Sequence, residues 1–123
     1  MNSLEKPFRE DIYGGKTPEE TWAMYVDAVK KRDIDLASKY VDVNHQGKEK
    51  EFLADEMKID NLDLYIYQIS GPLQKRTEPE YSENEPGRAY YFYRWKDKKT
   101  DKIEMSHSNF YLNPLTHVWK ILY

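Results

Sequence analysis

The stretch Thr17-Pro18-Glu19-Glu20 carries the signals of a helix start, and it constrains the fold more than any other part of the chain. A threonine at the N-cap accepts a hydrogen bond from the amide three residues on, where a glutamate can reach back, and proline is tolerated in the first helical turn. The apolar residues that follow recur at helical spacing: Trp22, Tyr25, Val26 and Val29. We therefore predict an amphipathic helix over residues 18–31.

The next fifty residues predict two further helices and a first strand. Asp33 offers a second N-cap, and a short apolar face follows it to about residue 41. A third helix is expected over residues 47–58, where Phe52, Leu53 and Met57 share a face. Residues 62–69 alternate between Leu62, Leu64 and Ile66 on one side and Asp63, Tyr65 and Tyr67 on the other. This alternation predicts a strand.

The last third of the chain is aromatic and alternating, which predicts three strands at about residues 88–97, 102–112 and 117–123. Short polar connections at 98–101 and 113–116 indicate hairpin turns. The acidic connection over residues 71–87 contains Pro and Gly residues and is long for a compact domain, so it is either mobile or an insertion with a purpose. Helices followed by strands indicate a single α+β domain over residues 17–123. Residues 1–16 are predicted to be a flexible arm or a segment lying on that domain.

Strand alternation assigns the terminal strands two different faces. Even-numbered hairpin loops place Trp95 opposite Glu104 and Phe110 opposite Trp119. The ring-rich face carries Tyr91, Tyr93, Trp95, Phe110, Leu112, Trp119 and Ile121, with Ser106 and Ser108 among them. The reverse face carries Arg88, Tyr90, Phe92, Arg94, Met105, His107, Asn109, Tyr111, Lys120 and Leu122. Since arginine and lysine heads are costly to bury without partners, we expect the ring-rich face to meet the helices.

Composition excludes several classes of function. The 123 residues have a formal net charge of -3, which disfavours nucleic-acid and anionic-membrane partners. There is no cysteine, and hence no disulfide, thiolate metal site or cysteine nucleophile. The 15% aromatic content argues for a folded chain despite 33% charged residues. No apolar run is long enough to span a bilayer, and the compartment stays open because a removed signal or lipid anchor would leave a similar start.

The Thr17-capped helix, the short second helix ending at Tyr40-Val41 and the closing strand at Val118-Trp119-Lys120-Ile121 resemble small bacterial members of the nuclear-transport-factor-2-like (SnoaL-like, cystatin-like) superfamily. The resemblance covers roughly residues 17–123. It implies two to three helices packed on a strongly curved, mainly antiparallel four-stranded sheet, which forms a cone with an interior cavity, and often a dimer made through the sheet. Members include cyclases, isomerases and dehydratases as well as non-catalytic binding domains, so fold alone does not choose among them.

Two sets of residues are candidates for binding. Ser106 and Ser108 put small hydroxyls among large rings, which either leaves a partly polar cavity or makes room for Tyr91 and Trp119. The predicted ligand-binding residues are Tyr91, Tyr93, Trp95, Ser106, Ser108 and Trp119. The predicted interface residues on the reverse face are Tyr90, Phe92, Met105, Tyr111 and Leu122, a mixture that partner surfaces favour.

We expect a non-catalytic, homodimeric binding or accessory domain that takes a small apolar or aromatic ligand or a protein partner and needs no cofactor. The alternative is a small lyase or isomerase in which Glu104 acts as the general base with Tyr91 or Tyr93. A third possibility is an accessory domain tethered at a bacterial cell surface. His45, His107 and His117 have no metal-site spacing and are expected to be ordinary surface or interface residues.

Overall fold

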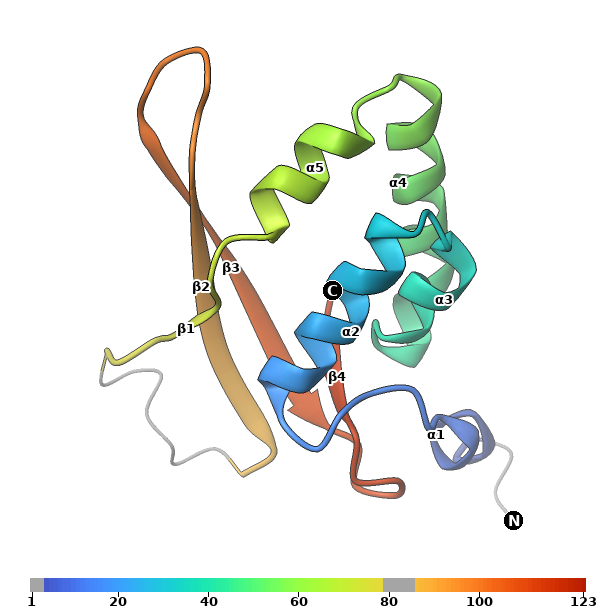
Figure 1. Cartoon of the computed structure of the whole chain (residues 1–123). Helices are drawn as coiled ribbons and strands as arrows, with labels where there is room; N and C mark the ends of the chain where they lie inside the picture. Colours follow the sequence, from blue (N-terminus) through green and yellow to red (C-terminus); the bar gives the residue numbers. More distant parts are fainter. Residues whose placement is uncertain (1–3, 79–85) are drawn as a thin grey trace.

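The computed structural model describes residues 4–78 and 86–123. Helices occupy the first part of the chain and strands the last, as Figure 1 shows. The helical elements are α1 (Lys6–Glu10), α2 (Pro18–Lys30), α3 (Ile34–Lys39), the 3-10 turn η1 (Val43–His45), α4 (Gln46–Lys58) and α5 (Leu62–Ile69). The strands are β1 (Gln74–Lys75), β2 (Arg88–Lys96), β3 (Ile103–Leu112) and β4 (Trp119–Leu122). The predicted α+β class is confirmed, and the antiparallel sheet is open.

Helices α2 and α3 begin at the capping residues that the sequence predicted. Thr17 accepts a hydrogen bond from the Glu20 amide at 3.1 Å, and Asp33 accepts one from the Leu36 amide at 3.1 Å. The Glu20 carboxylate reaches one residue further back than expected and accepts the Lys16 amide at 2.8 Å. The predicted helix over 47–58 is also confirmed, with its start one residue earlier.

The strand predicted over residues 62–69 is wrong, because this segment forms helix α5. The segment has apolar residues at both the two-residue period of a strand and the i, i+3, i+4, i+7 spacing of a helix. The helical set, Leu62, Tyr65, Ile66 and Ile69, is the one that packs on the core. Leu64, which the strand pattern placed on the same side as Leu62 and Ile66, is 46% exposed. In a segment of eight residues the alternation was coincidental.

The sheet has the order β1-β2-β3-β4 with antiparallel neighbours throughout. The β2–β3 register is the predicted one, with Trp95 opposite Glu104. The β3–β4 register is shifted by two residues, so that Phe110 lies opposite Ile121 rather than Trp119. The cause is a longer connection, in which the Asn113 side chain accepts the amide of Leu115 at 2.9 Å. A shift of two residues leaves every side chain on its predicted face.

The short strand β1 lies inside the connection that we predicted to be irregular over residues 71–87. It pairs with β2 through Gln74 opposite Phe92 and Lys75 opposite Tyr91. Two residues carry too little alternation to be recognised in a sequence. The acidic centre of this connection, residues 79–85, lies outside the described residues.

Helices α2 and α5 lie on the ring-rich face of the sheet, to the right of β2 and β3 in Figure 1. Tyr91, Tyr93, Phe110 and Ile121 are buried on this face, as predicted. The Trp22 ring of α2 lies 5.3 Å from the Tyr93 ring, measured between centroids. One part of the core is therefore a group of packed aromatic rings between the β2–β3 hairpin and helix α2.

The reverse face does not have the uniform exposure that we expected. Met105 is 52% exposed, and Tyr90, Phe92, Tyr111 and Leu122 are partly exposed. Lys120 shares this face but is completely buried, which contradicts our expectation that charged heads on this face would reach solvent. Residues 8–13 lie over it. None of the helices in the described ranges is long and apolar enough to cross a membrane.

Candidate functional site

The residues that we predicted to line a ligand cavity pack against one another and against α2. The Trp22 ring lies 6.3 Å from that of Phe110, and Tyr91 meets Phe110 edge-on at 5.5 Å. In the sheet Ser108 is opposite Tyr91 and Ser106 is opposite Tyr93. These small hydroxyl residues thus lie beside two of the buried rings. This placement favours the account in which the serines make room for the rings.

The two remaining residues of the predicted ligand set, Trp95 and Trp119, are partly exposed at separate positions along the sheet. Glu104, the alternative general base, is exposed on β3. A cavity base must be enclosed together with the groups that it serves. The exposed Glu104 lacks this enclosure, although Tyr91 and Tyr93 are buried.

An interior carboxylate was missed by the sequence reasoning. Glu49 of α4 is 5% exposed, and its Oε1 accepts a hydrogen bond from the Tyr25 hydroxyl at 2.5 Å. The Tyr25 and Tyr65 hydroxyls lie 2.7 Å apart. Glu49 precedes Phe52 and Leu53 by three and four residues, which puts it on the apolar stripe of its helix. An acidic residue at a position of the apolar stripe was the sequence signal that could have revealed the buried Glu49.

Burial controls the ionisation of this cluster. Desolvation raises the pKa of Glu49, and the hydrogen bond from Tyr25 partly opposes the rise. Burial likewise raises the pKa values of Tyr25 and Tyr65. The charge of Glu49 adds to the rise, because an ionised phenol would lie beside an ionised carboxylate. The cluster consequently holds a carboxyl group that keeps its proton to a higher pH than a solvated one.

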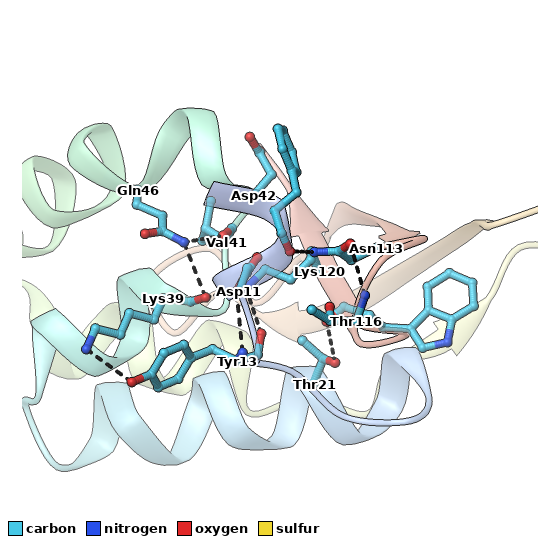
Figure 2. Close-up of polar contacts among 12 residues, drawn as sticks. Asp11, Tyr13, Thr21, Lys39, Val41, Asp42, Gln46, Asn113, Thr116 and Lys120 are labelled. Atoms are coloured by element: carbon cyan, nitrogen blue, oxygen red, sulfur yellow. Dashed lines mark hydrogen bonds and ion pairs between the residues drawn. The ribbon is translucent and has the colours of Figure 1, made fainter. Parts of the chain in front are cut away.

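A second polar cluster lies on the reverse face, where the N-terminal segment covers β4 (Figure 2). The Lys120 ammonium donates to Asp11 Oδ1 at 2.9 Å, to the Tyr13 carbonyl at 2.6 Å and to the Lys39 carbonyl. Burial lowers the pKa of Lys120, and the ion pair with Asp11 opposes this effect. Every donor of the ammonium thus has an acceptor, which is the condition for burying a charge.

The same segment is tied to the sheet at other points. The Asn113 side-chain amide donates to the Phe8 carbonyl at 2.9 Å, and the Trp119 amide donates to the Gly15 carbonyl at 3.0 Å. A side chain at Gly14 would come within 2.3 Å of the Trp119 carbonyl oxygen. Residues 8–15 therefore lie directly on the last hairpin, and Phe8 closes one side of a pocket.

This pocket, which we call the outer pocket, has a volume of about 270 Å³. It combines apolar and polar groups from four parts of the chain. Its lining residues are Phe8, Asp42, Asn44, His45, Arg88, Tyr111, Leu122 and Tyr123. Two of them, Tyr111 and Leu122, belong to the predicted interface set; the others were not predicted as site residues.

Asp42 organises one wall of the outer pocket. Its Oδ1 accepts the Asn44 amide at 3.2 Å and His45 Nδ1 at 2.7 Å, and its Oδ2 accepts the Tyr123 amide at 3.1 Å. The His45 ring stacks on the Tyr123 ring with centroids 5.4 Å apart. Since a carboxylate only accepts, Nδ1 carries a proton and Nε2 is the ring nitrogen left for a ligand. The histidine is held in a fixed orientation.

Arg88 and Tyr111 form a second part of the pocket lining. The Arg88 guanidinium lies over the Tyr111 ring, 5.8 Å from its centroid. Within the described residues, Arg88 is exposed and forms no ion pair with a carboxylate. Burial, with Asp11 and Asp42 nearby, raises the pKa of Tyr111 to about 12, so its hydroxyl is protonated at neutral pH.

Other surface hollows offer fewer functional groups. A pocket of about 350 Å³ between α2 and the end of α5 is walled partly by Trp22 and Ile69. Another, of about 210 Å³, lies between the N-terminal segment and Gln46.

The two other histidines lie outside the outer pocket: His107 contacts Arg76, and His117 is exposed in the last turn. The described residues contain no group of three or more metal ligands.

No protein-family model, curated protein or solved structure matches this chain.

Proposed function

We propose that this chain is a non-catalytic binding domain of the nuclear-transport-factor-2-like kind, and that it takes a small ligand in the outer pocket. The resemblance in sequence supplied the class, and the order of helices before an antiparallel sheet agrees with it. The ligand position differs from the one that we first expected, because the rings of the ring-rich face pack against α2.

The observation that carries the proposal is the convergence of a fixed histidine, an exposed arginine and aromatic walls in one hollow. Ligand sites are typically apolar concave surfaces with a few polar groups that set orientation. In the outer pocket His45 is oriented by Asp42, while Phe8 and Leu122 supply apolar surface. The exposed Glu104 gives no comparable support to a lyase or isomerase.

Backbone-amide chemical shifts test this function directly. Titration with phenol, indole, benzamide and benzoate is expected to give at least one saturable set of shifts at Asn44, Arg88 and Tyr123. Leu122→Trp fills the pocket and should abolish them. Met105→Trp, on the same face but outside the pocket, should leave them unchanged. Saturable shifts centred on Tyr93 and Ser106, or no shifts with any of the four compounds, contradict the proposal.

We also propose that the reverse face pairs two copies of the chain. Ile103 and Met105 of β3 are 65% and 52% exposed, next to the partly exposed Phe92. A sheet face of this kind can be self-complementary about a twofold axis. The N-terminal segment covers only the β4 end of the face, which leaves the β2–β3 part accessible.

A further inference from the structure

The charged side chains around the outer pocket differ in whether they already have partners of opposite charge or hydrogen-bond donors. Asp42 is engaged by three donors, and Asp11 is paired with the buried Lys120. Arg88 has no carboxylate partner in the part of the chain that the structure describes. A guanidinium presents parallel N–H donors that match a carboxylate. The uncommitted group of this pocket is thus a carboxylate binder.

The remaining surface of the pocket is mostly apolar. Phe8, Tyr111, Leu122 and Tyr123 face the same hollow as Arg88. The Tyr123 ring stacks on the His45 ring, and the Tyr111 ring lies under the Arg88 guanidinium. Flat rings held in this way stack with other flat rings at little cost in side-chain freedom. A ligand that suits both features has an anionic end and a planar apolar body.

The geometry points to a small aromatic carboxylate as the ligand of the outer pocket, with Arg88 holding the carboxylate and the ring lying among Phe8, Tyr111 and Tyr123. This assignment rests on the proposed binding function and specifies its chemistry. The volume of about 270 Å³ has room for a single-ring acid.

Three probes separate the two parts of this assignment. Benzoate has both the ring and the charge, benzamide keeps the ring without the charge, and acetate keeps the charge without a large apolar body. Titrations of the whole chain, followed by backbone-amide shifts, should give benzoate an affinity about tenfold higher than either of the other two. Benzamide binding as tightly as benzoate overturns the charged part, and acetate binding as tightly overturns the aromatic part.

Two arginines of the same strand provide matched variants. Arg88→Gln is expected to weaken benzoate binding about tenfold and to leave benzamide binding unchanged, because only the charge-assisted bonds are lost. Arg94→Gln is the control, since Arg94 lies on the same face over Phe92 and outside the pocket. Equal losses of benzoate affinity in both variants would mean that general surface charge, not Arg88, holds the anion.

The outcomes also separate this inference from the function beneath it. If benzamide or phenol saturates the outer pocket while benzoate binds no better, the binding function stands and the carboxylate assignment falls. If no probe shifts the pocket residues, both fall. Because Arg88 is exposed, the Gln variant is expected to fold normally, which its amide spectrum without ligand verifies.

Discussion

Glu49 links the protonation of one interior side chain to the stability of the whole fold. Burial raises its pKa above the unfolded value, so the folded state holds this proton more tightly than the unfolded chain does. Its contribution to stability is fully present below the unfolded pKa and is lost as the pH rises through the folded pKa. Burial of Glu49 therefore favours the protonated acid, and the hydrogen bond from Tyr25 offsets only part of this effect.

The Glu49→Gln variant tests this linkage, because an amide keeps an acceptor for Tyr25 and cannot ionise. We expect the unfolding free energy of the natural chain, minus that of the variant, to fall as the pH rises from about 4 to about 8. Urea unfolding at several pH values measures it. Glu51→Gln, at an exposed position of the same helix, controls for a general effect of charge. A difference that is independent of pH would show that Glu49 titrates alike in both states.

Lys120 and Asp11 form a buried ion pair, and we expect their effects on the unfolding free energy to be coupled. Lys120→Met leaves the Asp11 carboxylate buried and without its cation, which should cost about 3–5 kcal/mol of unfolding free energy. Adding Asp11→Leu should restore more than half of this loss. Lys31→Met, which breaks the exposed 2.9 Å pair with Asp27, should change stability little. Equal stability of the single and double variants would contradict the coupling.

These residues mark the limit of what periodicity predicts for single side chains. Alternation placed Lys120 on the correct face, but its burial depends on residues 8–13, which have no periodic signal. Glu49 was detectable in principle, since it falls in phase with Phe52 and Leu53. The His45 and Asp42 pair, 2.7 Å apart, depends on a single 3-10 turn whose course no pattern indicates.

A substitution at a position outside the core can test whether the segment of α5 is a helix or a strand. Leu64 is partly solvated, so side chains there report backbone preference more than packing. In a helix, Leu64→Gly should be about 1 kcal/mol less stable than Leu64→Ala, with Leu64→Val between them. In a strand, Val would be the most stable of the three. Thermal or urea unfolding of the three variants distinguishes the two orders.

Each element that was predicted correctly from the sequence carries more than one sequence signal, or one signal that repeats over many residues. Helix α2 has a cap, a proline in its first turn and a regular apolar stripe, and strands β2 and β3 keep alternation over nine and ten residues. Segment 62–69 had a single signal that two periods could satisfy. The β3–β4 register failed by two residues because Asn113 builds a longer turn than its hairpin spacing implied.

At the scale of the whole molecule, the proposed pairing through the reverse face predicts a solution mass of two chains by light scattering. Met105→Glu should give the mass of one chain, because a charge opposite its own copy is unfavourable at a twofold interface. Met57→Glu, exposed on α4 and away from the sheet, is the control. A natural chain that stays at one-chain mass at high concentration rules out this pairing.

The overall architecture was predictable, whereas the candidate site was not. The order of helices and strands fixes the α+β class, and side-chain parity fixes which face of the sheet is buried. The outer pocket joins residues 8, 42–45, 88 and 111–123, which approach one another only in the folded chain. No spacing in a single sequence encodes such a meeting.

The contact between Asp11 and Lys120 joins residues 109 positions apart in the chain. During synthesis Asp11 leaves the ribosome long before β4 exists, so its docking place is absent until that strand has been made. Contacts between such distant positions slow folding, because the loop must close before any attraction repays it. The N-terminal segment is consequently expected to attach last, as a closing step on a core that has already formed.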